Sequence, residues 1–475
     1  MNLSAATEPG AEGAVASAPT DGGARWRAWA ATAVPLVAWA ALVAVAWTRA
    51  EPYRSRWKLG AAPVMGSFDR HLTPATVLVL VVGLALARYL PGWCRTLGWR
   101  RMLVVATLAF VGWGAATSAI RGVDQLDRTM ADRHEYPAVI PLVDEVGVAT
   151  FVDTFTDEEV LRRYPIHVQG HPVGIALAYV GLDRVGLDGS GWAAAATVAV
   201  GMLVVPGVLV TTREVAGEDR ARRLAPFLAL APAAVWSVTS ADLVFAAVAA
   251  WAIALAVLAT GDDRDRSSRL GLGVASGLLW GLGIHLTYGL APIALVALAV
   301  IAWRRRWEVL PAIAVGALVV VGAFVAIGFW WFDGLAATRI RYEAGIASIR
   351  PRRYFTVLGN PAAFSLAVGP AAWVAVARVR DARLWLLAAG GLAAVAIADL
   401  SGLSKAEVER IWLPFAPWVL VLTGGLAALG AGVRTTTGVG RRWSWSPGWP
   451  PVAGNLLALQ VVLAVAIVSV VNTPW

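Results

Sequence analysis

The chain has 475 residues, of which 58% are hydrophobic and only 15% are charged, and its mean hydropathy is +0.65. Soluble domains contain roughly 45–50% apolar and about 25% charged residues, so this composition excludes an ordinary soluble protein and predicts a membrane protein. The net charge of +9 does not indicate a nucleic-acid partner, because the basic residues cluster in short segments between apolar stretches. The single cysteine, Cys94, excludes an internal disulfide and a cysteine-based metal cluster.

The apolar stretches predict an all-α, polytopic membrane protein of about 12–14 transmembrane helices, since each span needs roughly 20 apolar residues. Residues 1–24 are rich in Ala, Gly, Ser and Pro, and we expect a disordered cytoplasmic tail before one transmembrane domain over 25–475. The clearest expected helices are 28–48, 74–90, 102–120, 309–332, 359–377, 384–400, 413–433 and 452–471, and two more meet at 283–289. Arginine-rich segments between helices mark the cytoplasmic side of a plasma-membrane protein.

The longest polar stretch, 121–170, follows the third expected helix. It holds ten acidic residues against five arginines, and its apolar residues recur at near-helical spacing. We therefore expect amphipathic helices that lie on the outer face of the membrane. Further outer loops are expected at 333–358, which is rich in arginine, and at 401–411. The outer loop at 49–73 carries Arg54, Arg56, Lys58 and Arg70, against the usual cytoplasmic location of positive charge.

The number of crossings between residues 172 and 260 is open. Four apolar segments precede the charged run at 261–269, namely 172–187, 191–211, 225–237 and 241–259. Four full crossings would place that run outside, whereas its charge favours the cytoplasm. One segment is therefore expected to be short, re-entrant or broken, and the candidates are 172–187, with Asp183 and Arg184, and 225–237, with Pro226 and Pro232.

Polar residues suited to chemistry occur in four places. These are the acidic loop, the string from Tyr164 to Gly174, the arginines of 333–358, and the run from Lys405 to Arg410. Taken singly, most of these residues are solvated loop charges. Together they place acids, histidines and guanidinium groups on one face of a membrane protein, which fits an anionic, lipid-linked substrate and a carboxylate base.

The order of these motifs resembles that of a known superfamily. An acidic outer loop precedes His171-Pro172, which opens the next helix, and a proline later precedes Ser240-Ala-Asp242. This order is similar to the GT-C membrane glycosyltransferases, among them protein mannosyltransferases, aminoarabinose transferases and actinobacterial mannosyl- and arabinosyltransferases. There an acid pair precedes a His-Pro-Pro motif; here Asp144-Glu145 begins 27 residues before His171, and a valine replaces the second proline.

The resemblance implies that a sugar passes from a polyprenyl-phosphate donor to a glycan, lipid or protein acceptor on the extracytoplasmic side. It implies inversion at the sugar, with one carboxylate as the base. The candidate bases are Asp124, which follows an outward helix, and Asp144 of the acid pair. Substrate-binding residues are expected among Glu135, Glu145, His167, His171, Arg350, Lys405, Glu409 and Arg410.

No cofactor and no metal ion is expected. His167 and His171 have the spacing of a metal-binding pair on a helix, but Gly170 and Pro172 favour a loop or a helix start there. Two other functions stay open. A transporter or flippase of an anionic or lipid-linked substrate would show repeated halves with paired broken helices, which the sequence lacks. A non-catalytic scaffold is the third alternative.

Overall fold

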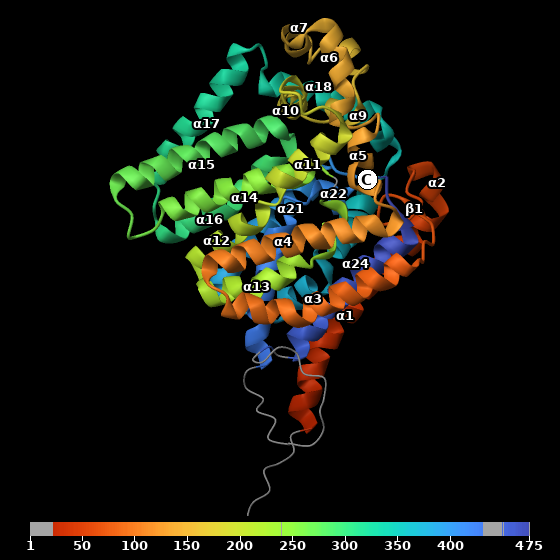
Figure 1. The fold of residues 1–475 in the computed structure, drawn as a ribbon, viewed down its shortest axis with the longest axis vertical. Coiled ribbons are helices and arrows are strands. Elements are labelled where there is room, and N and C mark those ends of the chain that lie inside the picture. The colour runs from red at the N-terminus through yellow and green to blue at the C-terminus, as the bar shows by residue number, and fades with distance from the viewer. Residues whose placement is uncertain (1–21, 239, 431–448, 450, 475) are drawn as a thin grey trace, which may run out of the picture.

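The structure is a computed structural model, and it describes residues 22–238, 240–430, 449 and 451–474. The described part is almost entirely helical, which confirms the all-α class (Figure 1). The first half contains α1 Gly22–Ala50, η1 Glu51–Tyr53, α2 Arg54–Trp57, β1 Ser67–Phe68, α3 Pro74–Thr96, α4 Trp99–Ser118, η2 Ala119–Arg121, α5 Gln125–Ala131, η3 Tyr136–Val139, α6 Ile140–Val146, α7 Val148–Asp153, α8 Glu158–Leu161, α9 Ile166–Gln169, α10 Val173–Arg184, α11 Gly189–Gly201, α12 Val204–Ala216 and α13 Glu218–Ala229.

The second half continues in the same way. It contains η4 Pro232–Trp236, α14 Asp242–Ala259, α15 Arg266–Leu286, η5 Tyr288–Ile293, α16 Ala294–Arg304, α17 Val309–Ala326, α18 Trp331–Ala344, η6 Ile346–Ile349, α19 Arg352–Tyr354, η7 Phe355–Gly359, α20 Asn360–Arg378, α21 Ala382–Ser401, α22 Val408–Ile411, α23 Ala416–Leu420, η8 Val421–Gly430, α24 Pro451–Val470 and β2 Val471–Asn472. β1 and β2 pair antiparallel, with Ser67 opposite Asn472.

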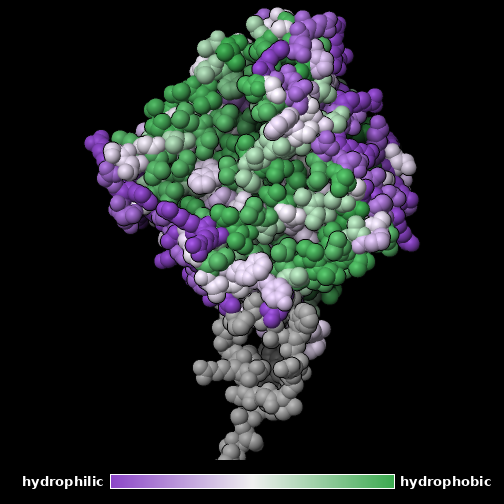
Figure 2. Space-filling model, viewed as in Figure 1, coloured by the Kyte–Doolittle hydropathy of each residue, from purple (hydrophilic) through white to green (hydrophobic). Residues whose placement is uncertain are grey.

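Ten helices of the described residues are long and apolar enough to cross a membrane. Two shorter apolar helices, Tyr288–Arg304 and Ala416–Leu426, bring the count to the lower end of the predicted range. Figure 2 shows an apolar surface across the middle of the molecule, with hydrophilic residues gathered at the left margin and along the right and upper right margins. A band of this kind between two polar margins is what a multi-pass membrane protein requires.

The two polar margins carry different elements. The turn between α14 and α15 lies at the left margin (Figure 1). The right and upper right margin is formed by α2, β1, α5, α6 and α9, and we call it the α5 rim. The acidic segment and the charged run at 261–269 therefore lie at opposite margins.

The segment between 172 and 260 contains both long and short helices. Of the two candidate segments, 172–187 forms the short helix α10, and 225–237 is broken between α13 and η4. Neither α10 nor α13 is among the long apolar spans, whereas Gly189–Ala216 and α14 are. The sequence predicts one short or broken segment, whereas in the structure both candidates are short or broken and two long spans remain.

Several boundaries differ from the sequence prediction. α1 begins at Gly22, so residues 22–24 are helical and not part of a disordered tail, while the rest of that prediction lies outside the described residues. The expected outer loop at 333–358 is mostly helical, in α18, η6, α19 and η7. The dense arginine of this segment predicts a polar loop, but arginine is also a good helix former, and the segment folds as helices.

The acidic segment 121–170 forms short helices, and many of their apolar side chains pack within the protein. Val139, Val143 and Phe151 are fully buried, although the sequence suggested contact with the membrane. Phe151 and Phe155 pack edge to face with ring centroids 5.4 Å apart, and Phe155 packs in the same way against Phe329 at 5.8 Å. The segment is therefore fixed on the helical body, because aromatic burial of this extent is strongly stabilising.

Candidate functional site

Eight charged or titratable side chains from distant parts of the chain gather beneath the α5 rim. They are Glu135, His167, His171, Asp242, Arg350, Glu407, Glu409 and Arg410, and we call them the ionic cluster. Five of them, Glu135, Asp242, Arg350, Glu409 and Arg410, are buried. Buried charges are costly unless paired, so this arrangement must be held by specific contacts.

The centre of the ionic cluster is the pair Asp242–Arg410. Nη1 of Arg410 donates to Oδ2 of Asp242 at 2.5 Å, and both side chains are almost completely enclosed. Ser240 Oγ donates to the same carboxylate oxygen at 2.7 Å, and Nη2 of Arg410 lies 3.6 Å from Glu407 Oε2. The pair thereby ties the start of α14 to α22.

Glu135 and the two histidines form the side of the cluster that faces the acidic segment. Glu135 Oε1 lies 2.8 Å from His167 Nδ1. The buried ring of Tyr136 packs against both histidines, with its centroid 6.0 Å from that of His167 and 5.4 Å from that of His171. Burial lowers the pKa of His171 to about 4, although the nearby Asp242 carboxylate acts in the opposite sense, so this imidazole is neutral at pH 7.

A close backbone approach positions His171. Gly174, in the first turn of α10, lies so near the end of α15 that a Cβ there would be 2.4 Å from the carbonyl oxygen of His285. His171 Nδ1 lies 3.3 Å from the carbonyl oxygen of Leu286 in the same turn. Donation from Nδ1 to this carbonyl leaves Nε2 as an acceptor.

Arg350 joins the cluster to the segment after α1. Its Nε donates to the carbonyl of Trp57 at 3.0 Å, and its Nη1 donates to the carbonyl of Lys405 at 2.8 Å. The next residues, Ala406 and Glu407, are left-handed, with φ of 78° and 66°. Such conformations cost about 1–3 kcal/mol each in non-glycine residues, so the surrounding contacts must hold the 401–411 segment in place.

Glu409 is the most deeply enclosed carboxyl of the cluster. Its side chain is 0% exposed, Oε1 accepts the backbone N–H of Met65 at 2.8 Å, and Oε2 has no hydrogen-bond partner among the described residues. Burial raises the pKa of Glu409 to about 7, while the Met65 N–H and Arg410 lower it by less. A substantial fraction of Glu409 is therefore protonated at neutral pH.

This pKa predicts a pH-dependent stability. Folding favours protonated Glu409, so its stabilisation is complete below the ordinary pKa of 4.5 and is lost as pH rises through about 7. The variant Glu409→Gln keeps the acceptor for Met65 and does not titrate. In melting experiments on detergent-solubilised protein, wild type should lose stability relative to Glu409→Gln between about pH 4.5 and 7 and then stay level. A difference that does not change with pH would contradict the burial of an ionisable Glu409.

A second prediction concerns the pair Asp242–Arg410. Arg410→Met should lower the free energy of unfolding by about 3–5 kcal/mol, because it leaves the Asp242 carboxylate buried without its partner. The double variant Asp242→Asn/Arg410→Met should recover most of this loss, since both charges are then absent. Unfolding by SDS titration measures both values.

The matched control is Arg184→Met, which removes the partner of the exposed Asp144. Exposed pairs contribute about 0–1 kcal/mol, so this variant should be nearly neutral. Equal decreases in the free energy of unfolding for Arg184→Met and Arg410→Met would show that the buried pair contributes no more to stability than the exposed pair.

The remaining candidate residues lie outside the cluster. Asp124 is exposed just before α5, where Gln125 Nε2 donates to its Oδ2 at 3.2 Å. Asp144 is exposed and lies 2.5 Å from Arg184 Nη2, and Glu145 beside it is also exposed. Lys405 Nζ donates to the carbonyl of Ala347 at 2.9 Å. The structure thus brings six of the ten candidates into the ionic cluster, places Lys405 beside it, and leaves the two candidate bases and Glu145 at the surface.

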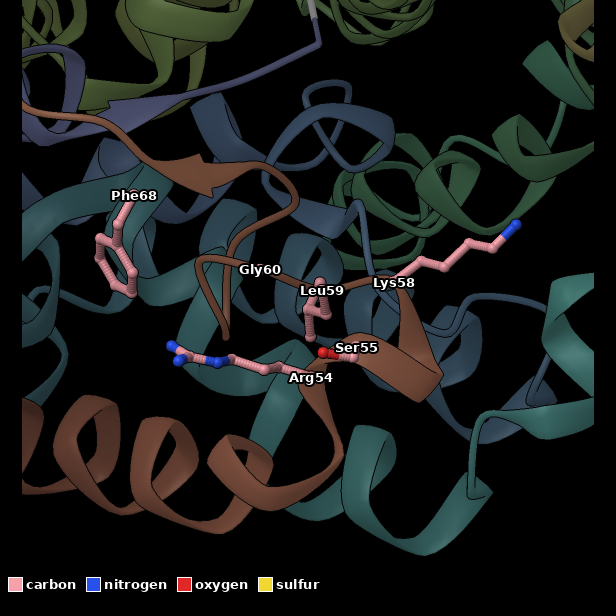
Figure 3. Close-up of a pocket in the computed structure, with 6 residues that line it drawn as sticks. All are labelled: Arg54, Ser55, Lys58, Leu59, Gly60 and Phe68. Atoms are coloured by element: carbon pink, nitrogen blue, oxygen red, sulfur yellow. The ribbon is translucent and has the colours of Figure 1, made fainter.

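Three surface cavities lie near the cluster. The α5 pocket, of about 320 Å³, is lined by Met65, Gly66, Ser67, Gln125, Arg128, Thr129, Asn472, Thr473 and Pro474. The loop pocket, of about 350 Å³, is lined by Arg339, Tyr342, Glu343, Ala347, Ser348, Arg352, Ser401, Gly402, Leu403 and Lys405. The α2 pocket, of about 460 Å³, is lined by Arg54, Ser55, Lys58, Leu59, Gly60 and Phe68 (Figure 3).

Three residues of the site, Asp242, Glu407 and Tyr136, are not among the candidates taken from the sequence. Only the structure reveals Arg410 as the partner of Asp242, 168 residues away. Tyr136 gave no signal beyond its place in the acidic segment. The general signal for Asp242 was an acid at the start of an apolar span, where ionisable residues are usually functional.

The described residues contain no group of three or more His, Cys, Asp or Glu side chains that could hold a metal ion. His167 and His171 each pack against the ring of Tyr136, with ring planes at 40° and 90° to it.

Comparison with known proteins gives a limited likeness. Neither a protein-family model nor a curated protein matches the sequence. Two solved structures of ArnT from Cupriavidus metallidurans are similar, one bound to undecaprenyl phosphate and one in the apo state, each at 20% identity. Their TM-scores are 0.39 and 0.38, and the match covers 61% and 59% of this chain. The chain spans 60% and 54% of those proteins, so its function must be argued from its own residues.

Proposed function

We propose that this protein is a membrane glycosyltransferase that moves a sugar from a polyprenyl-phosphate donor to an acceptor hydroxyl at the extracytoplasmic face. One observation carries the proposal. At one polar margin of a multi-pass membrane protein, a buried cluster of carboxylates, histidines and arginines adjoins a pocket with three cationic side chains. The motif order resembling GT-C enzymes supports the same function.

Charge supports the proposed orientation. At the margin opposite the α5 rim, Arg264 lies in the α14–α15 turn, Arg266 and Arg269 lie at the start of α15, and Arg304 to Arg306 lie at the end of α16. Arg304 and Arg306 reach toward the α14 end of that turn, where Arg306 pairs with Asp262. Dense arginine in short connections marks the cytoplasmic side, which leaves the α5 rim extracytoplasmic.

In this proposal the loop pocket receives the donor phosphate. Arg339, Arg352 and Lys405 supply positive charge, and Glu343 is its one lining acid. Arginine can hold a phosphate through two parallel hydrogen bonds, whereas lysine acts as a point charge. A phosphate that carries a polyprenyl chain would sit here with its chain in the adjoining membrane.

In this proposal the 401–411 segment is positioned by Arg350, Glu409 and Arg410, which do not touch the substrate. Their buried contacts fix the 401–411 segment, which forms one wall of the loop pocket through Ser401 to Lys405. Glu135, His167 and His171 are proposed to bind sugar hydroxyls, since their acceptors and donors lie where the acidic segment meets the cluster.

Asp124 is the proposed base. It is exposed, no described residue forms an ion pair with it, and the next residue, Gln125, lines the α5 pocket. Asp144 is already paired with Arg184, so its carboxylate is less free to accept a proton from an acceptor hydroxyl. The Asp124 carboxylate would take the proton of the acceptor hydroxyl while the hydroxyl oxygen bonds to the anomeric carbon. As that bond forms, the bond from the anomeric carbon to the phosphate oxygen breaks, and polyprenyl phosphate leaves as an anion.

The third prediction tests the base. Asp124→Asn should lower turnover by about 10²–10⁴-fold, the usual contribution of such a group, with little change in donor affinity. The assay follows transfer from radiolabelled polyprenyl-phosphate sugars in membranes that contain the protein. Asp153→Asn, which changes an exposed acid of the same segment, is the matched control and should be silent.

The result also separates the alternatives. Loss with Asp144→Asn and not with Asp124→Asn would make Asp144 the base. Movement of intact lipid-linked sugar across liposome membranes, without any transfer product, would contradict the glycosyltransferase and favour a flippase.

The fourth prediction tests the loop pocket. Lys405→Gln should weaken binding of undecaprenyl phosphate by about tenfold, because it removes one charge-assisted contact worth about 1.5 kcal/mol or more. Arg163→Gln alters an exposed arginine of the acidic segment and should leave binding unchanged. Binding is measured by retention of the lipid in native mass spectrometry. Equal binding by wild type and Lys405→Gln would place the donor phosphate elsewhere.

A further inference from the structure

The α2 pocket lies where α1 leaves the apolar band. α1 belongs to a span from Trp29 to Trp57 with a mean hydropathy of 1.9, and only 6% of its apolar window is buried inside the protein. η1 and α2 follow at once, on the α5 rim (Figure 1). The pocket residues therefore stand at the depth of lipid headgroups, beside a helix whose surface is left to lipid.

Figure 3 shows how the pocket is formed. The guanidinium of Arg54 is directed toward the ring of Phe68, and the Ser55 side chain lies near the base of Arg54. Lys58 extends away from the other side chains, so it is a cation at the edge of the pocket. Gly60 allows the chain to fold back tightly, because a Cβ there would lie 2.7 Å from the carbonyl oxygen of Gly66.

Positive charge around the pocket is poorly balanced. Of the two acids in the 49–73 segment, Asp69 lies 2.8 Å from Arg121, and Glu51 lies 3.4 Å from Arg54 in a well exposed pair. Within the described residues, Arg56 and Lys58 form no ion pair. The cations of the 49–73 segment are contrary to the usual cytoplasmic location of positive charge. They lie on the α5 rim, which the proposed orientation makes extracytoplasmic.

The backbone of Lys58, at the edge of the pocket, adopts a strained conformation. Lys58 is left-handed, with φ and ψ of 50°, at the position that ends α2. Glycine or asparagine usually occupies such a position, because other residues are strained there. The strain is held by hydrogen bonds from the N–H of Lys58 to the carbonyls of Arg54 and Ser55.

Exposed aromatic rings surround the pocket. Trp47 is 43% exposed and Phe68 is 52% exposed, and their rings meet edge to face at 6.4 Å. Tyr53 is also exposed and stacks on Trp57 at 4.9 Å. Amphipathic aromatic side chains of this kind concentrate at the level of lipid headgroups.

We propose that the α2 pocket binds the phosphate of an anionic phospholipid headgroup, as a site separate from the loop pocket. Arg54 donates two hydrogen bonds to the phosphate oxygens and the Ser55 hydroxyl donates a third, while Lys58 adds attraction from the edge. Trp47 and Phe68 contact the glycerol and the upper acyl chains.

The bound lipid would lie next to a wall of the ionic cluster. Trp57, which closes α2, gives its carbonyl to Arg350, and Leu59 of the pocket packs with Phe355 and Ala406. A lipid that holds α2 in place therefore stabilises the segment that carries Arg350. By mass action, such a ligand raises the melting temperature, and the rise grows with the logarithm of its concentration relative to the dissociation constant.

The test uses the full chain in nanodiscs of neutral phosphatidylcholine with added phosphatidylglycerol. Native mass spectrometry should show that wild type retains phosphatidylglycerol. Arg54→Gln should retain it at least about tenfold less, as expected for loss of a charge-assisted contact. The melting temperature of wild type should rise with phosphatidylglycerol, and that of Arg54→Gln should rise less. Arg163→Gln, at an exposed arginine of the acidic segment, should behave like wild type.

Three outcomes would overturn the proposal. Equal retention by wild type and Arg54→Gln would exclude the pocket, and an equal loss with Arg163→Gln would reduce the effect to general surface charge. Binding of soluble glycerol 3-phosphate as tightly as phosphatidylglycerol would show that the ligand is a free phosphate compound and not a lipid. Because no donor sugar enters this assay, its result is independent of glycosyl transfer.

Discussion

The buried pair Asp242–Arg410 is the interaction on which the arrangement beneath the α5 rim depends. Two opposite charges in an apolar interior can persist only together, so α14 and α22 are fixed relative to one another at this point. Arg410 also approaches Glu407, and Glu407 approaches Arg350, which extends the constraint to the segment after α1. The site is therefore built from short helices, helix ends and connecting segments that buried charge pairs hold in place.

The sequence predicted the general architecture well because bilayer thickness leaves few alternatives. For long apolar helices such as α21 and α24, the first and last residues in the structure lie within two residues of those expected from the sequence. The prediction failed where another force competes with hydropathy. α18 is a helix that carries arginines at a polar margin, and the short helices of the acidic segment bury Val139 and Phe151 in protein instead of lipid.

The site was predictable in its residue types but not in its pairing. His171, Arg410 and Glu409 were expected to act together because they lie on one face, and they do share the ionic cluster. That Asp144 instead pairs with Arg184, and that Asp242 holds Arg410, follows from tertiary contacts over 40 and 168 residues. No periodicity within a single segment carries such information.

Arg350 has a consequence for how this sequence can change over evolution. It binds the backbone carbonyls of Trp57 and Lys405, not their side chains. Every residue type offers the same carbonyl, so the side chains at both positions are free to vary without disturbing these two bonds. An insertion or deletion between Arg54 and Leu59, or between Ser404 and Glu407, would move the carbonyls out of reach. Related chains should therefore conserve the lengths of these two segments more strictly than their amino-acid identities.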